Sequence, residues 1–300
     1  MDFSKKIEIG EVCPRDGWQN HKVQIPTETK IKYIKKMLDC GPTNLEVTSF
    51  VNPKAVPQMA DAAEVVAGVK DYAEEKEIEL IGLALNKRGV DNARAAGLKS
   101  ISFVVSVSEE HNQRNSGKSI QASFDNFKEM MSEASDMKVL LALPCVFGSP
   151  FGDEIDLNLV IRLCKAAKEL GVSTFGLADT AGVSNPYHTK EVLQYLKAGG
   201  VNLENCAIHL HDTRGMGLAN AYVALESGIT RFDASLGAMG GCPFVPGAKG
   251  NIATEDLVNM VQKIGLPCDY DLPKAVATAI EMGNDISADI ISSMTSLCKH

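Results

Sequence analysis

The sequence predicts a (β/α)8 barrel, an α/β fold in which eight parallel strands alternate with helices. Short apolar runs alternate with amphipathic segments along the 300 residues, and eight of these runs are strand candidates. Eight strand–helix units in about 250 residues match the count and length of this fold. The runs are nearly continuous in apolar character, which is typical of parallel strands covered on both faces. No GxGxxG motif opens the first helix, which disfavours a doubly wound open sheet.

The elements follow in chain order. The expected strands are Ile7–Cys13, Thr43–Thr48, Glu79–Leu85, Ser100–Val107, Lys138–Cys145, Thr174–Ala178, Cys206–His211 and Arg231–Leu236. Apolar residues at helical spacing predict helices between them, among others at Thr27–Cys40, Ser123–Ser135, Leu157–Leu170, Pro186–Ala198 and Leu218–Ser227. Several are followed by a glycine, as helices often are, namely Gly41, Gly171, Gly199 and Gly228.

The last part of the chain predicts helices beyond the barrel, Ala253–Ile264 and Pro273–Met282. The second has proline in its first turn and Gly283 just past its expected end, the usual helix punctuation. No linker rich in proline, glycine or serine separates this part from the rest. We therefore expect a single barrel domain over residues 1–300, with extra helices from about 252 to 300 packed on it.

The composition excludes several classes of protein. A net charge of −8 disfavours nucleic acid or an anionic membrane as a partner. No apolar run approaches the roughly 20 residues of a membrane span, and the first residues have no apolar signal core. Eight cysteines are widely spread without a CxxC pair, which is typical of a reduced protein. We expect a cytoplasmic protein.

The ends of the first two strands carry polar residues, and in such barrels the chemistry lies at the C-terminal ends of the strands. A carboxylate such as Asp16 can bind a hard cation, and Arg15 can neutralise charge on an oxygen. Glu46 shares a strand face with Thr48, and a buried glutamate needs a partner, for which Arg15 is the natural candidate. For Arg15 and Asp16, the alternative is a surface ion pair before the turn at Gly17. For Glu46, the alternative is a structural ion pair in the core.

The seventh strand ends in the pair His209 and His211. Residues two apart on a strand point the same way, so both imidazoles face one point, and imidazole is a common metal ligand. Asp212 or Thr213 could orient the rings, and the alternative is a pair of core histidines. With Asp16 and the amide oxygen of Asn251, the donor set suits Mg²⁺ or Mn²⁺ better than structural zinc.

Two further features lie at strand ends. The loop after the eighth strand holds five glycines within 14 residues and carries Cys242. Such a loop could cradle phosphate or act as a lid, and the alternative is an inert buried cysteine. Asp179 ends the sixth strand, where it is either a further carboxylate of the site or a cap for the next helix.

These residues fall in segments that resemble the 3-hydroxy-3-methylglutaryl-CoA lyase family of the DRE-TIM metallolyase superfamily. The similarity runs along nearly the whole chain. It is carried by PRDGWQN from Pro14, LEVTSFVNPKAVPQM from Leu45, ADTAGV from Ala178, HLHDTRG from His209 and GGCPFVPGAKGNIATEDLV from Gly240. The last segment is the most specific, because the shorter motifs are shared with isopropylmalate and homocitrate synthases.

The resemblance implies roles for individual positions. It implies that Arg15 contacts the thioester oxygen with support from Glu46, and that Cys242 is an acid or proton carrier. Asp179 would be a further catalytic residue. The implied metal ligands, for Mg²⁺ or Mn²⁺, are Asp16, His209, His211 and Asn251, and the implied supporting or substrate-binding residues are Gln19, Ser49 and Glu255. The implied assembly is a homodimer, and the implied ligand is an acyl-CoA thioester.

The implied reaction is carbon–carbon cleavage of 3-hydroxy-3-methylglutaryl-CoA to acetyl-CoA and acetoacetate. The chain departs from the family pattern at Trp18, His21, Gln113–Ser119 and Leu141–Pro150, where an expected aromatic residue and a second cysteine are missing. We expect these departures near the substrate, so citramalyl-CoA or a related thioester is a second candidate substrate. A synthase that condenses a 2-oxo acid with acetyl-CoA is a competing interpretation, and so is a non-catalytic barrel.

Overall fold

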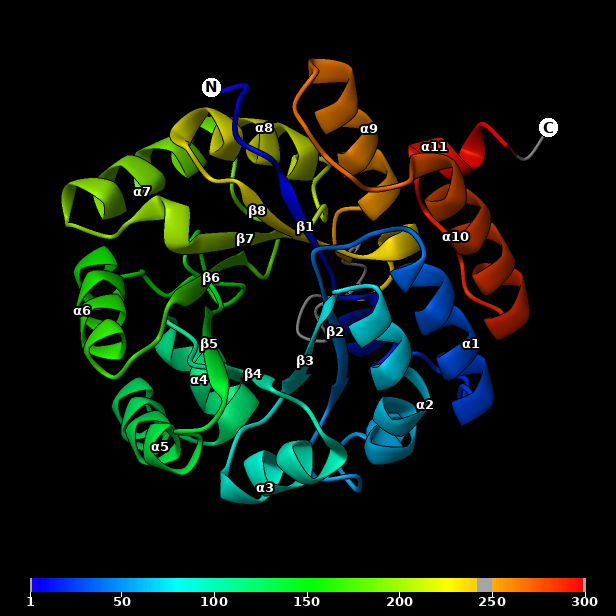
Figure 1. The fold of residues 1–300 in the computed structure, drawn as a ribbon. Coiled ribbons are helices and arrows are strands. Elements are labelled where there is room, and N and C mark those ends of the chain that lie inside the picture. The colour runs from blue at the N-terminus through cyan, green and yellow to red at the C-terminus, as the bar shows by residue number, and fades with distance from the viewer. Residues whose placement is uncertain (1, 242–249, 299–300) are drawn as a thin grey trace.

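Eight parallel strands close into a barrel in chain order in the computed structural model, which describes residues 2–241 and 250–298 (Figure 1). The strands are β1 (Glu8–Glu11), β2 (Asn44–Ser49), β3 (Glu79–Leu83), β4 (Ser100–Val104), β5 (Lys138–Leu143), β6 (Thr174–Asp179), β7 (Cys206–Leu210) and β8 (Arg231–Ala234). Each strand pairs with the next in the chain, and β8 pairs with β1 to close the ring. The (β/α)8 fold class is therefore confirmed, and all eight expected strands are present.

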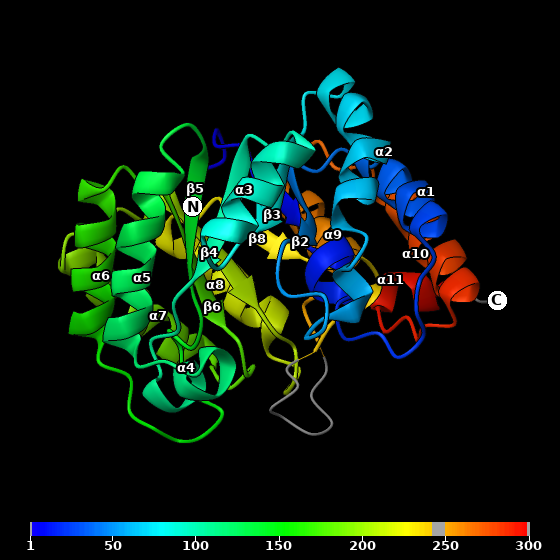
Figure 2. The ribbon, with the colours of Figure 1, turned by 90° about the horizontal axis from the view of Figure 1, so that it is seen from below.

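A ring of helices surrounds the barrel (Figure 1). These are α1 (Thr27–Leu38), α2 (Ala62–Glu75), α3 (Lys87–Ala96), α4 (Glu109–Ser116), α5 (Ile120–Glu133), α6 (Leu157–Glu169), α7 (Pro186–Ala198) and α8 (Gly217–Ser227). Helices α4 and α5 both follow β4, and α4 lies in the connection that leaves the C-terminal end of that strand. The side view in Figure 2 shows α4 apart from the α5–α6 layer.

The apolar core lies between the strands and these helices. Val139, Leu141 and Leu143 of β5 are 6%, 0% and 0% exposed, and they alternate with residues that face into the barrel. Leu45 and Val47 of β2 are buried in the same layer. The alternation follows from the two-residue period of a strand, and burial of the outer row holds the helices on the barrel.

Three more helices follow the barrel, α9 (Thr254–Ile264), α10 (Leu272–Ile286) and α11 (Ser293–Ser296). Helix α10 packs against α1, and the two lie side by side in Figure 1. The expectation that Gly283 lies past the end of the second helix is wrong, because α10 continues to Ile286 and ends at Ser287 with a φ of 54°. Gly283 instead lets Ile290 pack closely, since a Cβ there would stand 2.4 Å from Ile290 Cγ1.

Two observations concern the chain's surroundings. No helix among the described residues is long and apolar enough to cross a membrane. Cys13, Cys40, Cys164, Cys206, Cys268 and Cys298 are free thiols.

Candidate active site

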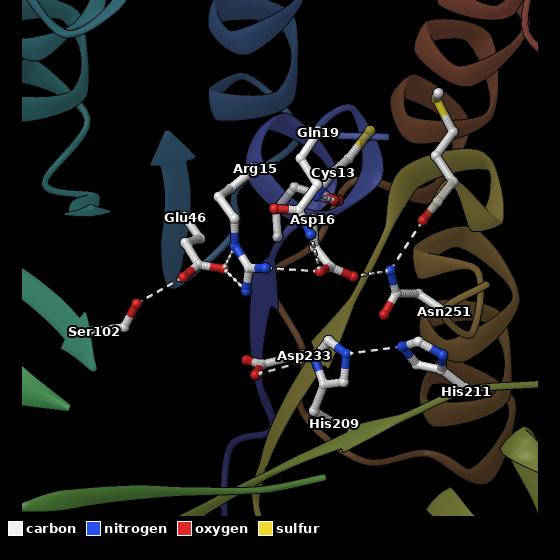
Figure 3. A network of polar contacts seen from close by, with 12 residues as sticks. Cys13, Arg15, Asp16, Gln19, Glu46, Ser102, His209, His211, Asp233 and Asn251 are labelled. Carbon is white, nitrogen blue, oxygen red and sulfur yellow. Dashed lines mark hydrogen bonds and ion pairs between the residues drawn. The ribbon is translucent and has the colours of Figure 1, made fainter. Parts of the chain in front are cut away.

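A cavity of about 510 Å³ occupies the barrel and reaches the C-terminal ends of its strands. Arg15 and Asp16 line it from the turn after β1, Glu46 from β2, and His209 and His211 from the end of β7. The structure thus brings together at one place residues that are far apart in the sequence. Figure 3 shows their side chains converging from separate strands.

Three of the four expected metal ligands form a tight cluster. Ligand atoms of Asp16, His209 and His211 lie within 4.8 Å of one another, and the two imidazole Nε2 atoms are 3.2 Å apart. Asn251 donates its Nδ2 hydrogens to Asp16 Oδ2 at 2.8 Å and to the Met239 carbonyl at 2.9 Å. Asn251 Oδ1 is buried without a hydrogen-bond partner within the described ranges, and in Figure 3 it points toward the imidazoles.

Local backbone structure positions these ligands. A π-helical turn, Cys13–Gly17, follows β1 and turns Arg15 and Asp16 toward the barrel mouth, and such turns are frequent at functional sites. His211 forms an antiparallel β-bridge with Asn251, so the end of β7 holds the start of the last segment. Gly240 allows this approach, because a Cβ there would stand 2.7 Å from Asn251 Nδ2.

The electrostatics of the cluster keep its donors available to a cation. Burial opposes ionisation of Asp16, but Arg15 and the two histidines outweigh it and lower its pKa to about 2. Burial and the neighbouring His209 lower the pKa of His211 to about 4, so this imidazole is neutral at pH 7. A carboxylate, two imidazoles and an amide oxygen without a partner fit a hard divalent cation.

Arg15 lies in a chain of charged groups beside the cluster. Its Nε and Nη2 contact Glu46 Oε2 at 2.7 Å and 2.6 Å, and its Nη1 contacts Asp16 Oδ1 at 2.7 Å. Ser102 donates to the other Glu46 oxygen at 2.7 Å. Burial disfavours the charged guanidinium, but Glu46 and Asp16 outweigh this and raise the pKa of Arg15. The guanidinium is therefore a fixed positive charge facing the cavity.

The remaining expected residues differ in where they lie. Gln19 and Ser49 line the cavity, and Gln19 donates to Asp16 Oδ1 at 3.3 Å. The Asp179 carboxylate instead accepts the backbone N–H groups of Val183 and Ser184. The Glu255 carboxylate accepts the N–H of Gly237, so neither acid is gathered into the cluster. Cys242 lies outside the described residues.

Sequence reasoning missed Asp233 on β8. Its Oδ2 lies 3.6 Å from His209 Nδ1, and this carboxylate raises the pKa of His209 against the opposing effect of burial. The expected orienting residue Asp212 instead accepts the N–H of Gly217 at 2.8 Å. The sequence offered one signal for Asp233, the two-residue alternation of β8, which places its side chain inside the barrel. The register of the sheet then pairs it with His209 on the neighbouring strand.

Some of the residues that depart from the family pattern line the cavity, and others do not. Ala142, Pro144 and Asn115 line the cavity. The expectation is wrong for Trp18, which is 1% exposed in the core, and for His21, whose Nε2 lies 2.8 Å from the Ile286 carbonyl of α10. The parts of the cavity that differ from the family pattern are therefore the end of β5 and the Asn115 position on α4.

The chain is similar to known proteins over nearly its whole length. The family model described as HMGL-like matches residues 6–281. The hydroxymethylglutaryl-CoA lyase YngG of Bacillus subtilis is 40% identical over 281 residues, which are 93% of each protein. The chain also resembles the crystal structure of an HMG-CoA lyase from Bacillus subtilis, with a TM-score of 0.94, 37% identity and full coverage of both chains.

A second structure, an HMG-CoA lyase from Acinetobacter baumannii in complex with coenzyme A and 3-methylmalate, is also similar. Its TM-score is 0.92 at 35% identity, covering 99% of this chain and 96% of that one. The family model spans nearly the whole barrel, and the relatives match over almost their full length. The chain therefore belongs to the HMGL-like family of lyases.

Proposed function

We propose that this protein cleaves 3-hydroxy-3-methylglutaryl-CoA into acetyl-CoA and acetoacetate with the help of Mg²⁺ or Mn²⁺. The observation that carries the proposal is the convergence of Asp16, His209 and His211, with the free amide oxygen of Asn251, beside the Arg15 guanidinium. The named lyases among its relatives support the choice of substrate. A bound divalent cation would polarise the hydroxyl of the substrate and lower its pKa.

Arg15 stabilises the charge that the bond cleavage produces. When a base accepts the hydroxyl proton and the bond between carbons 2 and 3 breaks, carbon 3 becomes a ketone and the electron pair moves to carbon 2. The thioester then carries negative charge on its oxygen as an enolate. A fixed positive charge in a partly buried site stabilises such an oxygen far more than water does. Glu46 and Asp16 hold the guanidinium in place by contacts on two sides.

Carbon 2 must gain one proton to give acetyl-CoA. We assign this step to the thiol of Cys242, whose ordinary pKa of about 8.5 keeps it mostly protonated at pH 7. The support for this assignment is the glycine-rich segment that carries Cys242 and joins β8 to the cluster residue Asn251.

The activity test is a panel of thioesters with the purified protein and MgCl₂. Release of acetyl-CoA and acetoacetate in equal amounts from 3-hydroxy-3-methylglutaryl-CoA, and its loss on chelation, is the expected result. Brisk cleavage of citramalyl-CoA with none of the first thioester would replace the substrate and keep the reaction class. Consumption of acetyl-CoA with a 2-oxo acid would instead indicate a synthase, and binding of neither metal nor acyl-CoA would indicate a non-catalytic barrel.

The role of Cys242 has its own test. Cys242→Ser replaces the thiol with a hydroxyl of similar size that is a far weaker acid, so we expect turnover to fall by about 10² or more. Mn²⁺ affinity should remain that of the wild type, because the four proposed ligands are intact. Turnover close to that of the wild type would remove Cys242 from the mechanism.

We further propose a cytoplasmic homodimer and one domain over the whole chain. The free thiols of Cys13, Cys40, Cys164 and Cys206 support a reducing compartment. Packing of α10 on α1 and on the segment after β8 supports a single domain. Light scattering of the purified protein measures the oligomeric state.

A further inference from the structure

The cavity does not end at the proposed metal ligands. Its wall continues down the inside of the barrel to Ser102 on β4, Leu140 and Ala142 on β5, Gly176 on β6 and Ala207 on β7. Ala207 is one inward position before His209 on the same strand. Successive inward positions are about 7 Å apart, so this lower part, the barrel hollow, begins directly beneath the site.

Exposure on β5 shows that the hollow is open space. Leu140 and Ala142 point into the barrel and are partly exposed, whereas Val139, Leu141 and Leu143 on the outer side of the strand are buried. In an ordinary barrel of this class the interior is filled by layers of bulky branched side chains. Here the inner face of the strand is the more exposed one.

A row of small residues creates the hollow. Ala142 is the register partner of Gly176, and Gly176 is the register partner of Ala207. Three neighbouring strands thus present no atom beyond Cβ at one level of the barrel. The backbone does not require a glycine at position 176, because a Cβ there would make ordinary contacts of 3.4 Å and 3.5 Å with Ala142. The missing side chains therefore leave volume, and no structural need of the backbone explains the glycine.

The chemistry of the hollow favours an apolar occupant. Its wall includes Ile81, Val104 and Leu140, and the Ser102 hydroxyl is already engaged by Glu46. At the far end the charged groups are paired, Lys138 with Glu79 at 2.8 Å and Arg231 with Glu8 at 3.1 Å. An apolar group placed there would bury its surface without stripping water from an unpaired charge.

The hollow can hold only one part of an acyl-CoA. Coenzyme A is too large for the barrel and must remain at the mouth. The reacting carbon lies at the cluster, so a group that extends downward is a substituent on that carbon. We propose that the barrel hollow binds an apolar branch longer than methyl on carbon 3, so that the preferred substrates are 3-alkyl-3-hydroxyacyl-CoA thioesters. This inference rests on the proposed lyase function and narrows its substrate class.

The test compares kcat/KM for two thioesters, 3-hydroxy-3-methylglutaryl-CoA and 3-hydroxy-3-pentylglutaryl-CoA, in the presence of MgCl₂. We expect the wild type to cleave the pentyl compound at least as efficiently as the methyl compound. Ala142→Leu fills the hollow and should lower the pentyl-to-methyl ratio of kcat/KM about tenfold or more, as steric occlusion of an apolar pocket does. Gly176→Ala, which the contacts above accommodate, should lower it in the same direction.

The matched control is Ala122→Leu, the same substitution on the exposed face of α5, which should leave the ratio unchanged. Wild-type preference for the methyl compound, with a ratio that neither hollow variant alters, would overturn this inference and leave the lyase function standing. Cleavage of neither thioester would overturn the proposed cleavage of 3-hydroxy-3-methylglutaryl-CoA and this inference with it.

Discussion

Arg15 is the residue whose geometry is most demanding. Its guanidinium contacts Glu46 through two nitrogens and Asp16 through a third. A planar fork can satisfy both carboxylates at once, whereas an ammonium group is a point charge that cannot. The charge that faces the cavity is therefore held in one orientation by two neighbouring elements, β2 and the turn after β1.

Arg15→Lys keeps the charge and loses this fork. We expect kcat to fall on the order of 10²-fold, the effect of misplacing one group that stabilises an oxyanion. Steady-state kinetics with 3-hydroxy-3-methylglutaryl-CoA measure it, and Arg162→Lys, the same substitution at an exposed arginine of α6 paired with Asp156, is the matched control. Wild-type kcat in Arg15→Lys would show that the fork is dispensable.

We propose that Asp233 is a positioning residue that acts through His209, whose Nδ1 lies 3.6 Å from Asp233 Oδ2. We expect Asp233→Asn to weaken Mn²⁺ binding about 10- to 100-fold, as loss of a carboxylate behind a metal-binding histidine does. Titration calorimetry with Mn²⁺ measures this independently of activity. Asp269→Asn, on an exposed aspartate paired with Lys6, is the control. Equal affinities in both variants would contradict the assignment.

At the scale of elements, the strands were predictable because each is an apolar run between polar turns. Helix α3 was harder to predict, since Lys87–Ala96 is rich in charge and contains Gly89. A Cβ at Gly89 would stand 2.8 Å from the Phe50 carbonyl oxygen, so the glycine allows a close contact there. Three of the proposed metal ligands, Asp16, His209 and His211, could be predicted from strand ends, because the fold places those ends together. Asp233 could not, because its partner His209 on the neighbouring strand is visible only once the register is known.

The end of α10 shows a glycine used for packing rather than for helix termination. Gly283→Ala would be favourable in an exposed helix, but here the new methyl would meet Ile290. We expect the free energy of unfolding to fall by about 1–3 kcal/mol, the cost of overpacking. Urea unfolding measures it, and the double variant Gly283→Ala with Ile290→Ala should lose less than the sum of the single variants. Strict additivity would contradict the steric explanation.

At the scale of the whole molecule, two buried carboxyl groups join the barrel to the last helices. Glu11 at the end of β1 accepts the N–H of Leu236 and the hydroxyls of Thr254 and Tyr270. Glu255 on α9 accepts the N–H of Gly237. Burial raises the pKa of each to about 7. The closure of the barrel and the docking of α9 therefore depend on groups that titrate near neutral pH.

The pH dependence of the free energy of unfolding tests whether Glu255 titrates near neutral pH. Glu255 has a pKa of about 7 when folded against an ordinary value of 4.5, so the folded protein binds more protons than the unfolded chain between these values. Its contribution to the free energy of unfolding is full below pH 4.5 and is lost as the pH rises to 7, at about 1.4 kcal/mol per pKa unit. His211, whose pKa is lowered to about 4, has the opposite effect. Its contribution to the free energy of unfolding rises with pH between about 4 and its ordinary pKa of 6.5.

The difference between the wild type and Glu255→Gln isolates the glutamate, because His211 is present in both proteins. We expect the wild type to lose stability relative to the variant as the pH rises from 5 to 7, measured by urea unfolding at each pH. A constant difference across this range would show that Glu255 is ionised throughout.

We propose that Asp16, His209, His211 and Asn251 together hold the divalent cation that makes the barrel a carbon–carbon lyase. A Mn²⁺ titration of chelator-treated protein can follow metal binding and acetyl-CoA release from 3-hydroxy-3-methylglutaryl-CoA in the same samples. We expect both to rise together and saturate at one equivalent, and His211→Ala to shift both to higher Mn²⁺ concentration. Full acetyl-CoA release without added metal, or binding that His211→Ala leaves unchanged, would contradict this proposal.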